Sequence, residues 1–394
     1  MTFQKRYIYP LVIQDLGEKM VFVGGPRQVG KTTLAKMIAA QNFSHPLYLN
    51  WDVQKHKKSM LSGAFPDKTD LVILDELHKY YRWKNYIKGI FDTQRERLKI
   101  LVTGSARLDV YRRGGDSLFG RYHHYRLHPF SVGELTGNRL HAQPGEKLVF
   151  PHPADARTHF ESLLRFSGFP EPLFKQNEKA LRRWHAAYVE RLVRDEIRDL
   201  ETVRDLSALF ILVDLIPPRV GSRLSLNSLR EDLEVAHKTV SSWVDILELF
   251  YYLFRIQPYH ERMVRSLRKE PKVYLWDWSR VEDPAARLEN IIASHLLKFT
   301  HLLHDAEGYR AELFYLRDTQ AREVDFLVTV NRKPWFAVEV KHSDEEPSKH
   351  LAYFGDRLKI PFLYQVVAAA GVDFWDARKN ISVMSADRFL SGLV

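Results

Sequence analysis

Apolar residues in the first third of the chain lie in short continuous runs rather than in alternation with polar ones. The runs occupy residues 20–23, 71–74 and 100–102, and apolar positions at helical spacing follow the first of them. Continuous runs of this length are typical of strands that helices cover on both faces of a parallel sheet. The pattern therefore predicts an α/β fold, with β-α-β units on a mostly parallel sheet over residues 1 to about 135.

The middle of the chain has helical periodicity. Residues 157–200 predict helices that lie as a lid on the first domain. Residues 206–259 predict further helices, two of them joined by a short turn at 234–236, and then an apolar strand at 253–256 and a basic stretch at 262–272. Two helices joined by so short a turn and followed by a strand have the layout of a winged helix-turn-helix.

The last third of the chain changes pattern again. A helix is expected first, then three strands, a second helix and a fourth strand, which together make a second α/β domain. The expected elements lie at residues 286–299, 312–316, 322–330, 335–341, 349–359 and 362–367.

Composition and charge narrow the class of protein. With 394 residues, 45% of them hydrophobic, the chain is long enough for two or three cores. It has no cysteine, which excludes disulfides, zinc ribbons and cysteine nucleophiles and agrees with a reducing compartment. No signal peptide and no run of roughly 18 apolar residues is present, so a cytoplasmic protein without membrane contact is expected. A net charge of +10 favours a polyanionic partner such as DNA, with a solvated basic surface as the alternative.

A P-loop motif, Gly25-x-x-x-x-Gly30-Lys31-Thr32, follows the first apolar run. Glycines let backbone N–H groups approach a phosphate chain closely, and the helix that follows points its positive end at the anion. Lys31 would contact the β and γ phosphates, and the Thr32 hydroxyl would bind Mg²⁺. The motif predicts that ATP binds, and a glycine turn without a ligand is the alternative. The predicted binding residues are Gly25, Pro26, Arg27, Gln28, Val29, Gly30, Lys31, Thr32 and Thr33.

Two acids end the second apolar run. Asp75 would hold Mg²⁺ through water, and Glu76 would polarise the attacking water. The third run leads into Thr103-Gly104-Ser105, where Ser105 is the candidate that contacts the γ-phosphate and a simple turn is the alternative. Together with the P-loop, these residues predict ATP hydrolysis.

Arg121 follows Phe119-Gly120 and precedes a late strand. Oligomeric AAA+ ATPases place at this point an arginine that reaches into the nucleotide site of a neighbouring subunit. Arg121 is therefore the candidate for this trans-acting role, and it predicts a homo-oligomer, a ring such as a hexamer. The alternatives are Arg107, Arg112 or Arg113 in that role, or a plain structural arginine.

The second helix of the predicted helix-turn-helix carries candidates for DNA contact. In such a unit this helix offers small polar and basic side chains to the major groove. Contact with another protein is the alternative role of a winged helix. The candidates are Lys238, Thr239, Ser241 and Ser242.

Two carboxylates and a lysine in the last third have the spacing of a metal-dependent nuclease site. Glu339 and Lys341 share one face of a strand, and a hairpin through 331–334 would bring Asp325 beside them. The acids would bind Mg²⁺ or Mn²⁺, the metal would activate a water, and the lysine would position the nucleophile. Glu289, on the helix before the strands, would add a ligand. For Glu339 and Lys341 alone, a surface ion pair is the alternative.

As a set, these motifs resemble a family of bacterial and archaeal AAA+-like ATPases whose C-terminal domain, of unknown function, is similar to PD-(D/E)XK nucleases. The resemblance implies ATP binding, a winged-helix insertion and a restriction-endonuclease-like α/β domain, and it leaves the cellular role open. The expected parts are an ATPase core at 1–155, a helical lid at 156–204, a winged helix at 205–272 and a nuclease-like domain at 273–394. The motifs that carry the resemblance are the P-loop, Leu74-Asp75-Glu76, Thr103-Gly104-Ser105, Phe119-Gly120-Arg121, Gly168-Phe169-Pro170, Glu323-Val324-Asp325 and Glu339-Val340-Lys341.

The leading hypothesis is an ATPase that remodels or translocates on DNA, with branched DNA among the candidate substrates, and that cuts DNA with its C-terminal domain. One alternative is an ATP-driven switch, in defence or regulation, whose nuclease-like domain is inactive and serves as an interaction module. A small-molecule phosphotransferase is disfavoured, because Glu76 suits activation of water and because the C-terminal two thirds would have no role in it.

Overall fold

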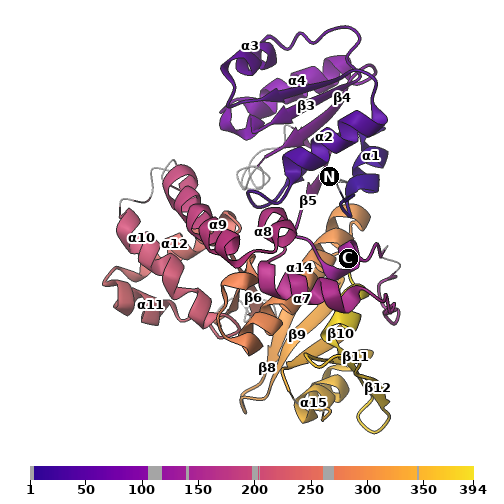
Figure 1. Cartoon of the computed structure of the whole chain (residues 1–394), viewed down its shortest axis with the longest axis vertical. Coiled ribbons are helices and arrows are strands. Elements are labelled where there is room, and N and C mark those ends of the chain that lie inside the picture. The colour runs from indigo at the N-terminus through magenta and orange to yellow at the C-terminus, as the bar shows by residue number, and fades with distance from the viewer. Residues whose placement is uncertain are drawn as a thin grey trace. The chain divides into compact units, whose positions relative to one another are not determined.

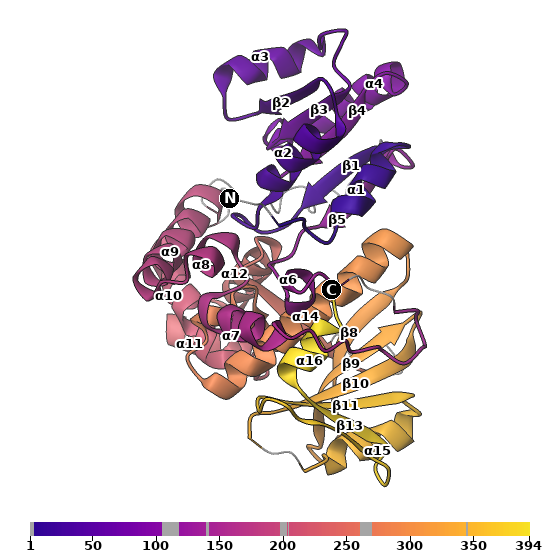
Figure 2. The same cartoon turned by 45° about the vertical axis from the view of Figure 1, so that its right-hand side comes forward.

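The computed structural model describes residues 4–104, 118–138, 142–197, 203, 205–260, 270–343 and 346–394. These residues divide into two compact units, one that ends at His128 and one that begins at Pro129 (Figures 1 and 2). Among the helices that the structure describes, none combines the length and the apolar character that crossing a bilayer requires.

The first unit is built on a five-stranded parallel sheet with the strand order β2-β3-β4-β1-β5. The apolar runs of the sequence form its three central strands, which are buried on both faces, so the predicted α/β fold with a parallel sheet is confirmed here. The strands are β1 Met20–Gly24, β2 Pro46–Asn50, β3 Leu71–Asp75, β4 Lys99–Thr103 and β5 Tyr122–Arg126.

Helices cover both faces of this sheet. Helix α4 (Trp83–Gln94) packs its apolar side on alternate strand residues such as Phe22 and Val72. Helices α1 (Tyr9–Leu16) and α2 (Lys31–Asn42) contact the strands from the other face, which the intervening residues form. Helix α3 (Gln54–Ser62) lies beside β2, and the 3₁₀ turn η1 (Leu77–Lys79) follows β3.

The second unit begins with helices. After α12 the chain forms the antiparallel β6–β7 hairpin, so the predicted order of helices, short turn and strand is present. The turn between α11 and α12 contains Glu234, whose φ of 53° ends α11 in the left-handed conformation. The elements are α6 Val132–Leu135, α7 Ala156–Phe166, α8 Pro170–Lys175, α9 Glu178–Arg191, the π-helical turn η3 Leu192–Ile197, α10 Leu206–Leu215, η5 Pro217–Arg219, α11 Leu226–Leu233, α12 His237–Leu249, β6 Leu253–Pro258 and β7 Lys272–Leu275.

The C-terminal part of this unit is an eight-stranded sheet with the order β12-β13-β11-β10-β9-β8-β6-β7. Helix α15 lies over one face of this sheet (Figure 2). Aromatic side chains of α14 and α16 pack on the other face. The last two strands and α16 were not predicted. The elements are η6 Trp278–Arg280, α14 Pro284–Glu307, β8 Ala311–Arg317, β9 Glu323–Val330, β10 Lys333–Lys341, α15 Lys349–Leu358, β11 Phe362–Val367, β12 Asp373–Asp376, β13 Ile381–Ser385 and α16 Ala386–Ser391.

The β6–β7 hairpin belongs to this sheet as well as to the helices before it. Strand β6 pairs in parallel with β8, where Gln257 lies opposite Phe314. A domain boundary between residues 272 and 273 would therefore cut through β7. The division into four parts stays a prediction.

A tight turn joins β9 to β10. Asn331 and Arg332 both have positive φ, 49° and 68°, as a two-residue type I′ hairpin requires. The register pairs Phe326 with Val338, and its continuation places Asp325 opposite Glu339. The hairpin that was predicted through residues 331–334 is thus present.

A buried polar cluster joins α6 to α14. Lys298 Nζ lies 2.7 Å from Glu134 Oε2 and donates a hydrogen bond of 2.7 Å to Ser131 Oγ. One turn earlier on α14, His295 Nε2 accepts the N–H of Val132 at 3.1 Å. Burial and the neighbouring Lys298 ammonium lower the pKa of His295 from 6.5 to about 3, so this ring is neutral in the folded protein.

The buried His295 predicts a dependence of stability on pH. The unfolded chain takes up a proton on this ring near pH 6.5, whereas the folded protein does so only near pH 3. The free energy of unfolding of the second unit should therefore fall as the pH falls from 6.5 toward 3, by on the order of 1.4 kcal/mol per pH unit. Urea denaturation at several pH values measures this slope. His295→Gln should flatten it, whereas the control His159→Gln, at a half-exposed histidine of α7, should not. An equal slope in the wild type and His295→Gln would contradict the expectation.

Candidate functional site

The P-loop connects β1 to α2, and two of its glycines are required by the backbone. Gly25 has a φ of 134°, and a Cβ there would lie 2.4 Å from the carbonyl oxygen of Leu127. Gly30, with a φ of 101°, caps the N-terminus of α2. The N-cap residue therefore makes no side-chain hydrogen bond to the first turn of α2, and the N-terminus of a helix favours an anion.

Lys31 is the first residue of α2, and its side chain folds back over the loop. Its Nζ donates hydrogen bonds to the carbonyl oxygens of Gly25 at 2.9 Å and Pro26 at 2.7 Å. Although this residue is only 8% exposed, its ammonium thus remains beside the loop that would hold the phosphates. Among the other predicted loop residues, Val29 is fully buried and Thr33 is exposed.

Two features of the loop were not predicted. Arg6, a buried residue before α1, donates hydrogen bonds to the carbonyl oxygens of Val29 and His128, at 2.8 and 2.5 Å. Gln28 has a φ of 60°, and its buried Oε1 has no hydrogen-bond partner among the described residues. The loop is therefore held in a conformation with a strained residue at its tip, as is common where backbone meets a ligand.

The carboxylate of Asp75, at the end of β3, accepts hydrogen bonds from side chains of α2 and of both neighbouring strands. Thr32 Oγ1 donates to its Oδ2 at 2.9 Å, and Thr103 Oγ1 donates to its Oδ1 at 2.5 Å. Tyr48 OH and Asn50 Nδ2, at the end of β2, also donate to Oδ2, at 2.6 and 3.3 Å. The carboxyl ends of parallel strands meet at one edge of the sheet, which explains why these side chains converge here.

Tyr48, Asn50 and Thr103 were not predicted as members of the site. Thr103 was detectable in principle, because it ends the third apolar run in register with Asp75. Burial and the hydrogen bond to Asp75 raise the pKa of Tyr48 to about 12, so its hydroxyl keeps its proton at neutral pH.

Glu76 follows Asp75 in the left-handed conformation, with a φ of 57°. Its N–H donates to the carbonyl oxygen of Thr103 at 2.9 Å, which fixes the residue across from β4. Its carboxylate lies 3.4 Å from Lys79 Nζ and 3.6 Å from His78 Nε2. Non-glycine residues in this conformation are uncommon and concentrate at functional sites.

Ser105 lies outside the described residues, as do Arg107, Arg112 and Arg113. Arg121 lies just before β5, and its guanidinium forms a bidentate pair with Asp92 of α4, at 2.7 and 3.1 Å. The hydrogen bond and the charge of Arg121 lower the pKa of Asp92. Within one chain, Arg121 therefore has a partner on the first unit itself.

The predicted nuclease residues lie together in the second unit. Asp325 faces Glu339 across the β9–β10 ladder, and its Oδ2 accepts the N–H of Val340 at 2.9 Å. Lys341 Nζ lies 2.8 Å from Glu339 Oε1. Glu289 joins them from α14, where burial and the charge of Asp325 raise its pKa.

An unpredicted lysine lies among these acids. Lys272 Nζ, on β7, is 2.8 Å from Glu323 Oε1, 3.2 Å from Asp325 Oδ1 and 3.3 Å from Glu289 Oε1. Tyr274, on the same strand, donates a hydrogen bond of 2.7 Å to Glu289 Oε1. We refer to Lys272, Tyr274, Glu289, Glu323, Asp325, Glu339 and Lys341 as the carboxylate cluster. The signal for Glu323 was its position two residues before Asp325 on one strand face, while Lys272 had been assigned to a basic stretch.

The lysines of the carboxylate cluster neutralise only part of the negative charge of its four carboxylates. Burial and the neighbouring Asp325 raise the pKa of both Glu289 and Glu339 to about 7. Glu339 Oε2 is buried without a hydrogen-bond partner among the described residues. Burial alone would lower the pKa of Lys272, but the charges of Asp325, Glu289 and Glu323 outweigh it and raise that pKa above its ordinary value. Lys272 is therefore a permanent cation in this cluster.

As folded, the carboxylate cluster does not fit a divalent metal ion. A metal would need the oxygens of Asp325 and Glu289, and the ammonium of Lys272 already lies against both of them. Over the described ranges, no group of three or more acidic or histidine side chains is arranged to hold a metal. The predicted metal ligands Glu289, Asp325 and Glu339 are thus brought together, but around a lysine.

Helix α12 exposes part of the predicted DNA-contacting surface. Lys238 and Ser242 are exposed, and Thr239 and Ser241 are partly buried. Trp243, on another side of the helix, is buried in the core. Most of the basic stretch at 262–272 lies outside the described residues.

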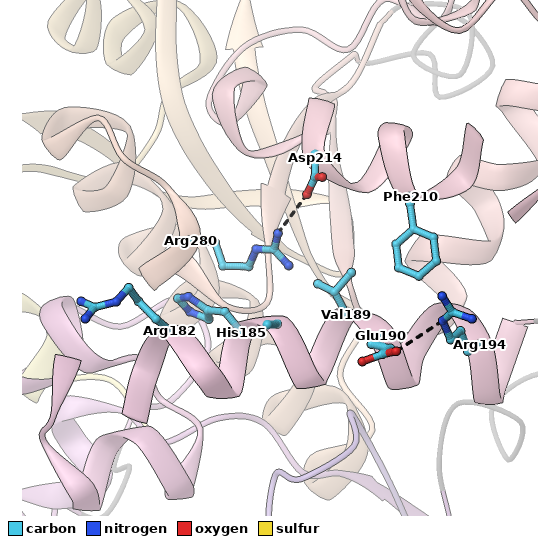
Figure 3. Close-up of a pocket in the computed structure, with 9 residues that line it drawn as sticks. Arg182, His185, Val189, Glu190, Arg194, Phe210, Asp214 and Arg280 are labelled. Carbon is cyan, nitrogen blue, oxygen red and sulfur yellow. Dashed lines mark ion pairs between the residues drawn. The ribbon is translucent and has the colours of Figure 1, made fainter. Parts of the chain in front are cut away.

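A cavity of about 610 Å³ lies between α9, α10 and η6 (Figure 3). Arg280 extends across it to Asp214, with Nη2 and Oδ1 3.5 Å apart. Arg194, in η3, pairs with Glu190 at 3.4 Å and lies over the ring of Phe210. Both of these arginines thus have an acidic partner, while a third, Arg182, also lines the cavity.

Comparison with protein families assigns the first part of the chain. Residues 17–136 match the family model of an AAA domain, in agreement with the parallel sheet and the P-loop. Residues 157–281 and 286–386 match the models of two domains of unknown function, DUF8612 and DUF4143. Residues 17–136 are thus similar to an AAA domain, while the winged-helix and nuclease-like assignments stay predictions.

The curated relatives carry no described activity. An uncharacterized protein of Methanocaldococcus jannaschii is 26% identical over 313 residues, which is 68% of this chain and 64% of that protein. An uncharacterized protein of Haemophilus influenzae is 21% identical over 362 residues, 83% of this chain and 84% of that protein. The chain therefore spans less than two thirds of the length of the archaeal relative.

Similar solved structures include the RuvB Holliday junction branch migration motor of Thermotoga maritima. It is 18% identical and covers 64% of this chain and 88% of its own, with a TM-score of 0.29. The ORC1 protein of Aeropyrum pernix, solved in complex with DNA, is 13% identical and covers 72% of this chain and 91% of its own, with a TM-score of 0.33.

Proposed function

We propose that this protein binds ATP with Mg²⁺ and hydrolyses it. The observation that carries the proposal is the convergence of Thr32 and Asp75, whose Oγ1 and Oδ2 atoms lie 2.9 Å apart at the end of the P-loop. A hydroxyl and a carboxylate beside a phosphate-binding loop are a donor set that fits Mg²⁺, and a bound Mg²⁺ would neutralise charge on the phosphates. The matched AAA domain supports the same function.

In this proposal, each residue of the nucleotide site has a separate role in ATP hydrolysis. The backbone N–H groups of the P-loop and the N-terminus of α2 bind the phosphates, and Lys31 turns from the carbonyl oxygens of Gly25 and Pro26 toward them. Glu76 accepts a hydrogen bond from the attacking water and orients it toward the γ-phosphate. Thr103 and Tyr48 hold the Asp75 carboxylate in place by donating to it.

The substrate on which ATP hydrolysis acts is DNA in this proposal. A net charge of +10 favours a polyanion, and the segment from α10 to β7 has the helices and hairpin of a winged helix. The exposed N-terminal residues of α12, with Lys238 foremost, would contact the nucleic acid.

Assembly into an oligomer is part of the same proposal and depends on Arg121. To act in the site of a neighbouring subunit, its guanidinium has to leave Asp92. The Arg121–Asp92 pair is exposed, and the net contribution of such a pair to stability is small. Replacement of that partner by a γ-phosphate is therefore energetically accessible.

For the C-terminal domain, the geometry favours the switch alternative over cleavage. Lys272 neutralises the acids that a nuclease would use for its metal, so the carboxylate cluster acts here as a structural ion cluster of an interaction module. Cleavage is the second candidate, and the unpartnered Oε2 of Glu339 is the observation that favours it.

DNA-dependent ATP turnover tests the proposal. Linear, forked and four-way DNAs are expected to bind the protein and to raise its ATPase rate. Lys238→Glu should weaken binding of every DNA and lower the salt slope of the binding constant by about one for each phosphate that Lys238 neutralises. The matched control is Lys349→Glu, at an exposed lysine in the first turn of α15, which should bind DNA as the wild type does. If no DNA changes the ATPase rate and both variants bind DNA equally well, a role for α12 in DNA binding is refuted.

A further inference from the structure

Lys272 is the least expected member of the carboxylate cluster. Its side chain is 3% exposed, and its ammonium contacts a carboxylate oxygen from each of Glu289, Glu323 and Asp325. These acids come from helix α14 and strand β9, so the ammonium lies where the two elements meet. We propose that Lys272 occupies the cation position of the carboxylate cluster, so that the folded protein holds a lysine there in place of a divalent metal ion.

The charges of the cluster support this assignment. Its carboxylates are those of Glu289, Glu323, Asp325 and Glu339, and its other cation, Lys341, pairs with Glu339 at 2.8 Å. Arg317 pairs with Glu323 from the rim. Lys272 contacts both Glu289 and Asp325, and partly buried carboxylates that lose such a counter-ion are destabilising.

The backbone around Lys272 holds its side chain toward the acids. Lys272 lies opposite Ile256 in the β6–β7 ladder. On its other side, Leu224 N donates to Pro271 O at 2.8 Å and Gly221 N donates to Val273 O at 3.0 Å. The start of β7 is thus hydrogen-bonded on both sides near Lys272, by β6 and by the segment at residues 221–224.

Gly221 makes room for the carboxylate on the far side of this contact. It has a φ of 76°, and a Cβ there would lie 3.1 Å from Glu289 Oε2. A side chain at this position would push the Glu289 carboxylate away from Lys272. The segment before α11 therefore contributes to the same ion cluster as β7, α14 and β9.

Metal binding by the full chain without nucleotide tests the proposal. Mn²⁺ binding, followed by electron paramagnetic resonance and by thermal unfolding, is compared between the wild type and Lys272→Met. Lys272→Met should unfold at a lower temperature than the wild type. It should also gain one Mn²⁺ site, and the apparent Kd of this site should be at least about tenfold lower than the Kd of any Mn²⁺ binding to the wild type that depends on Asp325. Mn²⁺ should restore its unfolding temperature, because the metal would replace the missing ammonium.

Three further variants make the result specific. Lys272→Met/Asp325→Asn should lack the gained site, which places that site in the carboxylate cluster. Lys341→Met removes the more exposed lysine of the cluster and should gain no site. In the wild-type background, Asp325→Asn should leave Mn²⁺ binding unchanged. A loss of Mn²⁺ binding on Asp325→Asn in the wild-type background would overturn the proposal even if Lys272→Met fails to fold. The proposal is also overturned if Lys272→Met binds Mn²⁺ no more tightly than the wild type.

Discussion

Replacing Glu76 by Gln is expected to lower ATP turnover by about 10²- to 10⁴-fold, the range typical of losing a group that acts on the proton of the nucleophile. The amide keeps the size of the side chain but no longer accepts a proton or polarises water as a carboxylate does. Nucleotide affinity should be retained, since Lys31, Thr32 and the backbone of the loop are unchanged. Phosphate release under saturating ATP measures the first quantity, and equilibrium binding of a fluorescent ATP analogue measures the second.

The matched control for Glu76→Gln is Asp52→Asn. Asp52 is an exposed carboxylate that shares Lys79 with Glu76, at 2.6 Å from its Nζ. Removing its charge alters the same lysine without touching the proposed catalytic position, so turnover should stay close to that of the wild type. Equal turnover by Glu76→Gln and the wild type would exclude Glu76 as the residue that activates water. Because Glu76→Gln should trap bound ATP, it is also the variant in which to look for the oligomer by light scattering.

The largest effect on stability is expected for Lys298→Met. Lys298 and Glu134 are a buried ion pair, with side chains 2% and 1% exposed. Removing the lysine leaves the Glu134 carboxylate without its cation inside the protein, and breaking such a pair from one side costs about 3–5 kcal/mol. The free energy of unfolding of the second unit, from urea denaturation at neutral pH, should fall by this amount.

A double variant separates the effect of the charge from that of the packing. In Lys298→Met/Glu134→Leu both charges are gone, and two apolar side chains of similar volume face each other. Replacing both partners is often neutral or stabilising, so most of the stability should return. If the single variant unfolds at the same urea concentration as the wild type, the pair does not hold α6 to α14.

Burial on two faces explains which strands could be predicted. Strands β1, β3 and β4 lie inside the parallel sheet, so each appears in the sequence as an uninterrupted apolar run. Strand β2 is an edge strand with one fully buried residue, and β12 is an exposed edge strand of the C-terminal sheet. Strand β2 has only the short stretch Leu47-Tyr48-Leu49, β12 has only Phe374-Trp375, and neither strand was predicted.

The two sites differ in how much of them local sequence could predict. The P-loop and Asp75-Glu76 are contiguous motifs whose spacing is set by phosphate geometry, and the structure brings Thr32 and Asp75 together. Lys272 is separated from Glu289 and Asp325 by 17 and 53 residues, and no local spacing relates them. Its position depends on β7 pairing within the sheet that also carries β9, a tertiary arrangement that a basic stretch does not indicate.

The origin of Lys272 constrains how this chain could be cut or recombined. Lys272 belongs to the segment that matches DUF8612, while Glu289, Asp325 and Glu339 belong to the segment that matches DUF4143. A fragment that begins at residue 273 would keep these acids, lose their central cation, and remove β6 from the edge of β8. Exchange of either segment between relatives should therefore be tolerated best when the partner segment supplies a matching charge.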